Sequence, residues 1–188
     1  MSPTVAFLGN GLTASGNWAE WLPEYDVLNL AVCGYTTADL LAGLDAVVAL
    51  RPDVVVLEVG TNDISDRKSD EDIVRNLEMT LCVLRRRLPR AGILVQSVLP
   101  RERDFTKTIR SVNRHLWQFA PTEHAQYLDL WPALAGPDGE LLPAYAVDSL
   151  HLTKEGYSAW LAELRPALQR LIERAPSRTS RPMRDLQA

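Results

Sequence analysis

The sequence predicts an α/β protein, a three-layer α/β/α sandwich built around a parallel five-stranded sheet. Short apolar runs alternate with longer amphipathic stretches along most of the 188-residue chain. Such alternation is typical of a parallel sheet with helices on both faces. The run at 53–59 (DVVVLEV) is almost continuously apolar, as expected of a central parallel strand that is buried on both sides.

The expected elements follow from apolar spacing. The five strands are expected at 4–8, 27–31, 53–59, 93–98 and 126–129. The helices are expected from a cap at Thr36 or Thr37 to about Leu50, at 70–87, at 105–119, and after a cap at Thr153. Pro166 lies inside the apolar stripe of the last helix, so we expect a kink or a split there.

Composition indicates one domain, since 46% of the residues are apolar and the length suits one core better than two. We expect this domain at 1–174 and a disordered tail at 175–188, which is rich in Arg, Ser and Pro. The net charge, 20 − 24 = −4, gives no reason to expect nucleic acid or an anionic membrane as a partner. Two cysteines, no targeting signal and no long apolar run lead us to expect a cytoplasmic protein. We expect no cofactor and no metal, and the oligomeric state stays open.

Four polar turns contain the residues that could do chemistry. In chain order they are Gly9-Asn10-Gly11-Leu12-Thr13, Cys33-Gly34-Tyr35-Thr36-Thr37, Gly60-Thr61-Asn62-Asp63 and Asp148-Ser149-Leu150-His151. Three of them follow successive strands, and in open parallel sheets ligands bind beyond the carboxyl ends of the strands. Each turn taken alone also fits an ordinary turn or surface loop, because Gly, Asn and Asp form turns for backbone reasons.

The chemistry of these turns points to acid–base and oxyanion roles. Asp148, three residues before His151, can hold the histidine Nδ1–H, which fixes the tautomer and leaves Nε2 able to take a proton. Asn62 could donate its amide N–H to a developing oxyanion, and Gly34 allows the backbone to approach a ligand closely. The first turn is not a phosphate-binding fingerprint, since neither a P-loop lysine nor the dinucleotide glycine pattern follows it.

Together the four turns resemble the motifs of the SGNH/GDSL hydrolase family. The family motifs are Gly-Asp-Ser followed by Leu or Ile and Thr, a glycine after the second strand, Gly-x-Asn-Asp, and Asp-x-x-His-Leu. They are matched in order by Gly9–Thr13, Gly34, Gly60–Asp63 and Asp148–Leu152. The stretches 16–18 and 129–156 are also similar to bacterial members that resemble platelet-activating-factor acetylhydrolase subunits. The resemblance spans roughly residues 5–171 and implies a flavodoxin-like sheet.

The resemblance implies hydrolysis of a small acyl ester or thioester. His151 would be the general base and Asp148 would orient it. The oxyanion hole would be formed by Gly34, Asn62 and the backbone N–H of Gly11. The supporting residues would be Asn10, Thr61 and Asp63.

The family's serine nucleophile is missing from this chain. Position 11 is glycine, which has no hydroxyl, and position 10 is Asn where the family has Asp. An acyl-enzyme cannot form at Gly11 by the usual route, so we expect ester turnover to be slow or undetectable. Two changes within one motif favour natural divergence over a deliberate knockout of the nucleophile, and both explanations stay open.

Two alternative functions fit the same pattern. One is a ligand-binding pseudoenzyme that has kept the pocket without the reaction. The other is a repurposed lyase, isomerase or cyclase in which the His151–Asp148 pair acts as general base on water or a carbon acid. The alternatives differ in whether His151 is needed for function and whether a serine at position 11 restores ester cleavage.

Other polar residues favour structural roles. Cys33 could replace the nucleophile, but a small buried residue in a tight turn is the favoured interpretation. Glu58 could be an acid with a raised pKa, and a carboxylate bonded to a nearby loop is favoured instead. Arg101 and Arg103 could meet an anionic substrate group, but a solvated loop is favoured. No catalytic role is assigned to Thr13, Ser15, His115 or His124.

Overall fold

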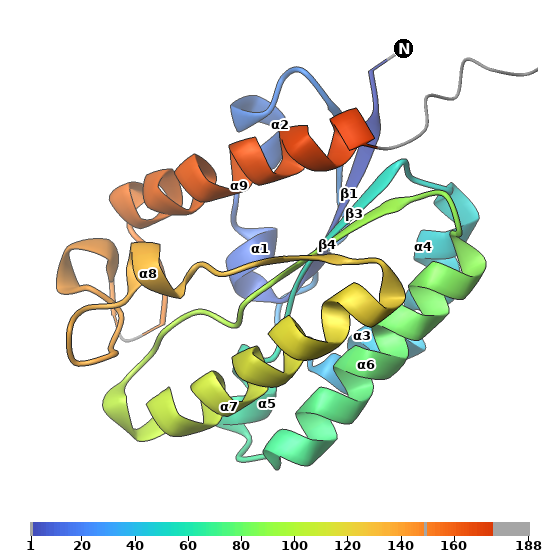
Figure 1. Ribbon diagram of the computed structural model, residues 1–188. Coiled ribbons are helices and arrows are strands. Elements are labelled where there is room, and N and C mark those ends of the chain that lie inside the picture. Colours follow the sequence, from blue (N-terminus) through green and yellow to red (C-terminus); the bar gives the residue numbers. More distant parts are fainter. Residues whose placement is uncertain (1, 149, 175–188) are drawn as a thin grey trace, which may run out of the picture.

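The computed structural model describes residues 2–148 and 150–174, and its centre is a five-stranded sheet with the order β2-β1-β3-β4-β5 (Figure 1). The strands are β1 (Thr4–Gly9), β2 (Asp26–Asn29), β3 (Val54–Glu58), β4 (Gly92–Gln96) and β5 (Gln126–Leu128). All four strand pairings are parallel. The predicted α/β/α sandwich with its flavodoxin-like sheet is therefore confirmed, and each expected strand end lies within two residues of the observed one. The expected tail at 175–188 lies outside the described residues.

Helices cover both faces of the sheet (Figure 1). One face is covered by α3 (Thr37–Ala42), α4 (Leu44–Leu50), α6 (Asp70–Arg87) and α7 (Arg103–Phe119). The other is covered by α2 (Trp18–Trp21), α8 (Trp131–Leu134) and α9 (Lys154–Arg174). Short 3₁₀ turns, η1 (Ala120–Glu123) and η2 (Pro143–Tyr145), complete the connections.

The central strand β3 supplies both hydrophobic cores. Val55 and Leu57 point into the cluster under α3, α4, α6 and α7, whereas Val54 and Val56 belong to the cluster under α2, α8 and α9. All five residues of β3 are buried. This is the reason for its nearly continuous apolar sequence, because neither face of the strand meets solvent.

Aromatic packing joins α2 and α9 to strand β1. The Trp18 ring stacks on Phe7 of β1, with ring centroids 4.8 Å apart and planes 5° apart. Trp160 of α9 meets the same Trp18 ring edge-on at 5.1 Å. The indole N–H of Trp18 donates to the backbone carbonyl of Thr13 at 2.7 Å, so this aromatic contact also holds the turn after β1 in place.

Two helix predictions are corrected by the structure. The helix expected from Thr36 to about Leu50 is two helices, α3 and α4, which meet at Gly43. Thr36 caps α3 in a capping box with Asp39, as a helix start requires. Of the kink or split expected at Pro166, the split does not occur, since α9 runs as one helix from Lys154 to Arg174.

The continuity of α9 has a packing explanation. Pro166 is exposed, whereas Leu164, Ala167 and Leu168 of the same helix are fully buried. The backbone carbonyl that loses its N–H partner to the proline ring lies on the side facing water, where solvent can satisfy it. The buried stripe on the opposite side holds the helix together.

The sequence analysis did not anticipate the shortest helices. These are α1 (Gly11–Ala14), α2, α5 (Thr61–Ser65) and α8. Each has only four or five residues, so none is long enough to show a helical apolar period. Two of them, α1 and α5, begin inside motifs that were expected to be turns.

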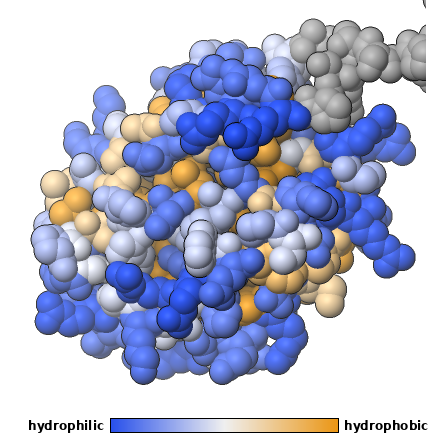
Figure 2. Space-filling view, in the orientation of Figure 1, coloured by the Kyte–Doolittle hydropathy of each residue, from blue (hydrophilic) through white to orange (hydrophobic). Residues whose placement is uncertain are grey.

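The face of the molecule seen in Figure 2 is mainly polar. Figure 2 shows hydrophilic side chains over most of the face in view, with hydrophobic side chains visible between them. No helix within residues 2–148 and 150–174 combines the length and the apolar character that crossing a bilayer requires.

Replacing Pro166 by Ala should stabilise the protein. Restoring the N–H inside α9 recovers a backbone hydrogen bond, against a smaller gain of conformational freedom in the unfolded chain. We expect the free energy of unfolding to rise by about 1–2 kcal/mol in urea titrations. Glu163→Ala, an exposed change in the same helix, is the control and should stay within about 0.5 kcal/mol. A destabilised Pro166→Ala variant would contradict this account of α9.

Candidate active site

The turns after β1, β2 and β3 lie at one edge of the sheet, because these strands are adjacent and parallel. The N–H of Val32 donates to the carbonyl of Gly9 at 3.1 Å, which joins the loop after β2 to the end of β1. The Asn62 side-chain amide donates to the carbonyl of Tyr35 at 2.8 Å, which joins α5 to the same loop. Direct hydrogen bonds therefore hold the first three motifs together.

The fourth motif reaches this edge through the start of α9. The Tyr157 hydroxyl donates to the carbonyl of Leu12 at 2.7 Å, so the first turn of α9 contacts α1. Leu12 and Leu152 both belong to the buried cluster on this face of the sheet. His151 directly precedes Leu152, and an antiparallel bridge between Leu152 and Ala146 closes the loop that carries Asp148.

Asp148 and His151 make the contact that their spacing predicts. Asp148 Oδ2 lies 2.9 Å from His151 Nδ1. Asp148 Oδ1 accepts the backbone N–H groups of His151 at 2.7 Å and Leu150 at 2.8 Å. The backbone bond from His151, followed by its side-chain bond, lowers the pKa of Asp148, so this carboxylate is ionised at neutral pH.

The contact determines which histidine nitrogen is available. A carboxylate at Nδ1 favours the tautomer with its proton on that atom, which leaves Nε2 as an acceptor. The side chains of His151 and Asp148 are 62% and 54% exposed, so a ligand can approach the ring from solvent. Within the described ranges, no group of three or more His, Cys, Asp or Glu side chains is arranged to hold a metal ion.

Asn10 builds the turn that presents position 11. Its Oδ1 accepts the N–H of Leu12 at 3.0 Å, which caps α1. The side chain is almost completely buried, with 1% of the residue exposed. Asn10 Nδ2 has no hydrogen-bond partner within the described part of the chain.

Gly9 and Gly11 differ sharply in how much space surrounds them. A Cβ on Gly9 would lie 2.1 Å from the backbone carbonyl oxygen of Glu58, so only glycine fits between β1 and β3. A Cβ on Gly11 would meet Cys33 Sγ at 3.3 Å and the Cys33 Cα at 3.9 Å, and no other atom of the surroundings that closely. Packing therefore requires glycine at position 9 and leaves room for a small side chain at position 11.

Gly34 has a backbone conformation that other residues rarely adopt. Its φ is +83°, which favours glycine. A Cβ on Gly34 would meet no atom within 4 Å, so the space beside it is open. Cys33, the preceding residue, is exposed, and the prediction of a small buried residue was wrong.

The third motif forms a short helix, where a turn was expected. Asp63 in α5 is buried and accepts two bonds from Thr37, at 2.8 Å from the N–H and at 2.7 Å from the hydroxyl. Burial raises the pKa of Asp63, and the Thr37 bonds oppose that rise. Asp63 therefore fixes α5 against the start of α3, while its neighbour Asn62 points its amide to the loop after β2.

Glu58 is fully buried at the end of β3. Its Oε2 accepts the hydroxyl of Thr13 at 3.3 Å, so Glu58 is bonded to the short helix α1 where a bond to a loop was expected. Its Oε1 has no partner in the part of the chain that the structure describes. Burial raises the pKa of Glu58 to about 8, so the group is mostly protonated at neutral pH.

Arg101 does not lie in a solvated loop, which corrects the prediction for this residue. It is 7% exposed, donates to the carbonyl of Thr61 at 3.3 Å and also bonds the Ser65 hydroxyl. Its guanidinium lies 4.6 Å from the centre of the Phe105 ring. Arg101 thus anchors α5 through Thr61 and Ser65. The polar sequence around Arg101 gave no sign that this side chain is buried.

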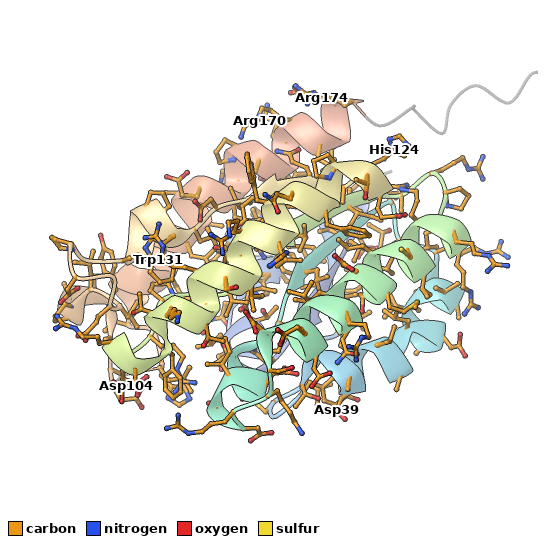
Figure 3. The ribbon with its side chains drawn as sticks, turned by 60° about the horizontal axis from the view of Figure 1, so that its bottom comes forward. Asp39, Asp104, His124, Trp131, Arg170 and Arg174 are labelled. Atoms are coloured by element: carbon orange, nitrogen blue, oxygen red, sulfur yellow. The ribbon has the colours of Figure 1, made fainter. Side chains whose placement is uncertain are left out.

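The other two histidines belong to none of the four motifs. His115 lies within α7. His124 precedes β5 whereas Trp131 follows it, and Figure 3 shows these two residues toward opposite ends of the molecule. His124 therefore lies at the amino end of the sheet, away from the motifs.

Comparison with known proteins decides the family. The profile of the GDSL-like lipase/acylhydrolase family matches residues 4–159, which is most of the chain. The chain belongs to the GDSL-like lipase/acylhydrolase family. The platelet-activating factor acetylhydrolase IB subunit alpha1 of Bos taurus is 27% identical over 181 residues, which cover 90% of this chain and 77% of that protein.

Solved structures of a lipase and an esterase share the fold. A GDSL-like lipase from Bacteroides thetaiotaomicron has a TM-score of 0.79 and 22% identity, covering 89% of this chain and 88% of its own. A carbohydrate esterase family 3 protein from Talaromyces cellulolyticus has a TM-score of 0.74 and 19% identity, covering 91% of this chain and 98% of its own. At these identities, the two similarities show that this chain shares their fold.

Gly9 and Gly11 should respond differently to alanine. Gly9→Ala forces a Cβ against the Glu58 carbonyl, and we expect a loss of more than about 3 kcal/mol or no folded protein. Gly11→Ala needs a shift of only a few tenths of an ångström by the exposed Cys33 side chain, so its cost should stay within about 1 kcal/mol. Urea unfolding of both variants checks this, and equal losses would contradict the account of the two sites.

Glu58→Gln should flatten the dependence of stability on pH. The folded-state pKa of about 8 lies above the ordinary value of 4.5, so the folded chain keeps a proton that the unfolded chain has lost. The stability contributed by protonated Glu58 is complete below about pH 4.5 and is lost as the pH rises to about 8. We expect that loss to be on the order of 3 kcal/mol between about pH 5 and pH 8.

The measurement is urea unfolding across this pH range. Glu58→Gln stays neutral and should lack this component of the slope, whereas the exposed Asp104→Asn should retain it. An unchanged slope in Glu58→Gln would show that Glu58 ionises normally in the folded protein.

Proposed function

We propose that this chain carries the active site of an acyl-ester or thioester hydrolase, lacking only the serine nucleophile. The observation that carries the proposal is the 2.9 Å contact between Asp148 and His151, placed before a helix that bonds to α1. In this proposal His151 Nε2 takes and returns a proton, and Asp148 holds the imidazole ring and stabilises its charged form.

The oxyanion donors in this proposal are Asn62, Gly34 and the N–H of Gly11. The Asn62 amide has two N–H bonds, and one of them donates to Tyr35. The second N–H remains to stabilise the charge that develops on the carbonyl oxygen of a substrate. The open space beside Gly34 gives that oxygen room next to the loop after β2. Thr61 and Asp63 support this arrangement by anchoring α5 through Arg101 and Thr37.

The proposed substrate is a small acyl ester or thioester. The relatives reported above are named as an acetylhydrolase, a lipase and a carbohydrate esterase, and these names favour ester cleavage over lyase, isomerase or cyclase chemistry. Two exposed valines adjoin motif residues. Val32, which precedes Cys33, is 40% exposed, and Val147, which precedes Asp148, is 70% exposed. Apolar surface beside the motifs suits a short acyl group.

The serine route of the family is lost in this proposal, because Gly11 has no hydroxyl to attack the carbonyl. Asn10 caps α1 as an aspartate would, so the turn keeps its shape with the changed residue. Packing does not demand the glycine at position 11 either, as the surrounding space shows. We therefore interpret the two changes as natural divergence on an intact scaffold.

Gly11→Ser should create measurable ester cleavage. A hydroxyl at this position meets an existing base and existing oxyanion donors, so we expect initial rates with p-nitrophenyl acetate to rise roughly tenfold or more. The gain should disappear in Gly11→Ser/His151→Ala. No gain over the parent chain, in a variant that folds normally by circular dichroism, would count against the hydrolase proposal.

A further inference from the structure

The thiol of Cys33 lies beside the position of the missing nucleophile. A Cβ added to Gly11 would lie 3.3 Å from Cys33 Sγ, which is the nearest atom to that position among those surrounding it. The Cys33 side chain is exposed, so a ligand at this edge of the sheet can reach the sulfur. The position that a serine would occupy in other family members is therefore flanked by a different nucleophilic group.

A second observation links this thiol to the segment that carries the base. Burial is the main cause that raises the pKa of Tyr157 to about 12, and the nearby Glu58 and Cys33 add to the rise. Cys33 is thus close enough to interact with Tyr157 in the first turn of α9. The hydroxyl of Tyr157 in turn donates to Leu12, the residue after Gly11. The thiol therefore neighbours Gly11 of α1, and it lies near enough to Tyr157 to affect the pKa of its hydroxyl.

Two buried polar groups beside α1 also lack a hydrogen-bond partner in the described part of the chain. Asn10 Nδ2 and Glu58 Oε1 are buried and make no hydrogen bond within residues 2–148 and 150–174. Asn10 adjoins Gly11, and Glu58 bonds the side chain of Thr13 in the same short helix. Buried polar atoms without partners are rare in folded proteins, and a catalytic role is one of the explanations for such an atom.

We propose that Cys33 is the nucleophile of this chain, a thiol from the loop after β2 acting in place of a serine in the loop after β1. The proposal rests on the proposed function, since it uses the same base, oxyanion donors and substrate class. A thiol needs less activation than a hydroxyl, because part of it is ionised near neutral pH and sulfur is intrinsically very nucleophilic. Gly34, the next residue, offers its N–H beside the attacked carbonyl.

The proposed reaction has two steps, acylation of the thiol and hydrolysis of the thioester. His151 Nε2 takes the proton from Cys33 Sγ while the sulfur attacks the ester carbonyl carbon, and the carbonyl electron pair moves onto oxygen. When the tetrahedral intermediate collapses, the C–O bond to the alcohol breaks and His151 returns the proton to the leaving oxygen, which gives an S-acyl thioester and a free alcohol. Water then attacks the thioester with His151 as base, which releases the carboxylic acid and restores the thiol.

The other cysteine of the chain is an internal control. Cys82 lies in α6, is partly buried, and its thiol donates to Glu123 Oε1 at 3.3 Å. Burial, together with the bond to Glu123, raises the pKa of Cys82, which lowers its reactivity. If a reagent modifies Cys33 only because the thiol is accessible, the rate of modification does not depend on His151. If Cys33 is the proposed nucleophile, that rate does depend on His151.

The experiment treats the full chain with p-nitrophenyl acetate and follows the release of p-nitrophenolate. Peptide mass spectrometry locates any acetyl group. We expect a burst of about one equivalent, with the acetyl group on Cys33, since acyl-enzyme accumulates when its hydrolysis is slower than its formation. The burst should disappear in Cys33→Ala and remain in Cys82→Ala. In His151→Ala the rate of Cys33 acetylation should fall roughly tenfold or more, and added imidazole should restore part of it.

The outcomes separate this proposal from the proposed function. The thiol proposal is overturned if Cys33 is not acetylated. It is also overturned if acetylation of Cys33 is no faster in the parent chain than in His151→Ala. Gly11→Ser/Cys33→Ala then tests the proposed function by itself, because it restores the serine and removes the thiol. If this double variant cleaves the ester, the proposed function stands without Cys33, and if it does not, both proposals fall. Where acetylation of Cys33 does depend on His151, the thiol proposal is supported, and with it the base role of His151 that both proposals share.

Discussion

The parallel pairing of β1 with β3 is the constraint on which the rest of the molecule depends. Their register pairs Gly9 with Glu58, so both strands end at the same level and α1 and α5 begin at one edge of the sheet. The backbones come so close there that a Cβ on Gly9 would overlap the Glu58 carbonyl. Both strands are buried on their two faces, and this burial keeps the pairing in place.

Two buried carboxyl groups at this edge have different surroundings and different consequences. Asp63 receives two bonds from Thr37, and these bonds fix the position of α5. Glu58 receives one bond, from Thr13, and burial keeps it mostly protonated. A buried carboxyl with full hydrogen bonding stabilises a structure, whereas one with an unmet atom reduces stability. The edge that holds the motifs therefore carries a built-in energetic cost at Glu58.

The carboxylate of Asp148 holds the backbone of its loop, but the imidazole of His151 has no clear structural purpose. Both side chains are more than half exposed, and solvent-exposed ion pairs contribute little to stability. The loop that carries them is held by backbone bonds and by the burial of Leu152, none of which needs an imidazole. An exposed imidazole held at Nδ1 by a carboxylate fits the proposed proton transfer better than a role in folding. The absence of a serine at position 11 therefore leaves the proposed acid–base pair, Asp148 and His151, in place.

The sequence by itself determined the sheet, its five strands, the long helices α6 and α7, and the spacing of Asp148 and His151. These features follow from local apolar periodicity and from a three-residue separation, so a short stretch of sequence is enough to predict each of them. Only the tertiary structure decided that Arg101 is buried, that Cys33 is exposed, and that α9 continues through Pro166. Each of these depends on which distant segment packs nearby, and the residue type alone does not carry that information. The proximity of the Cys33 thiol to Gly11 is of the same kind, because residues 22 positions apart meet only where the ends of β1 and β2 lie side by side.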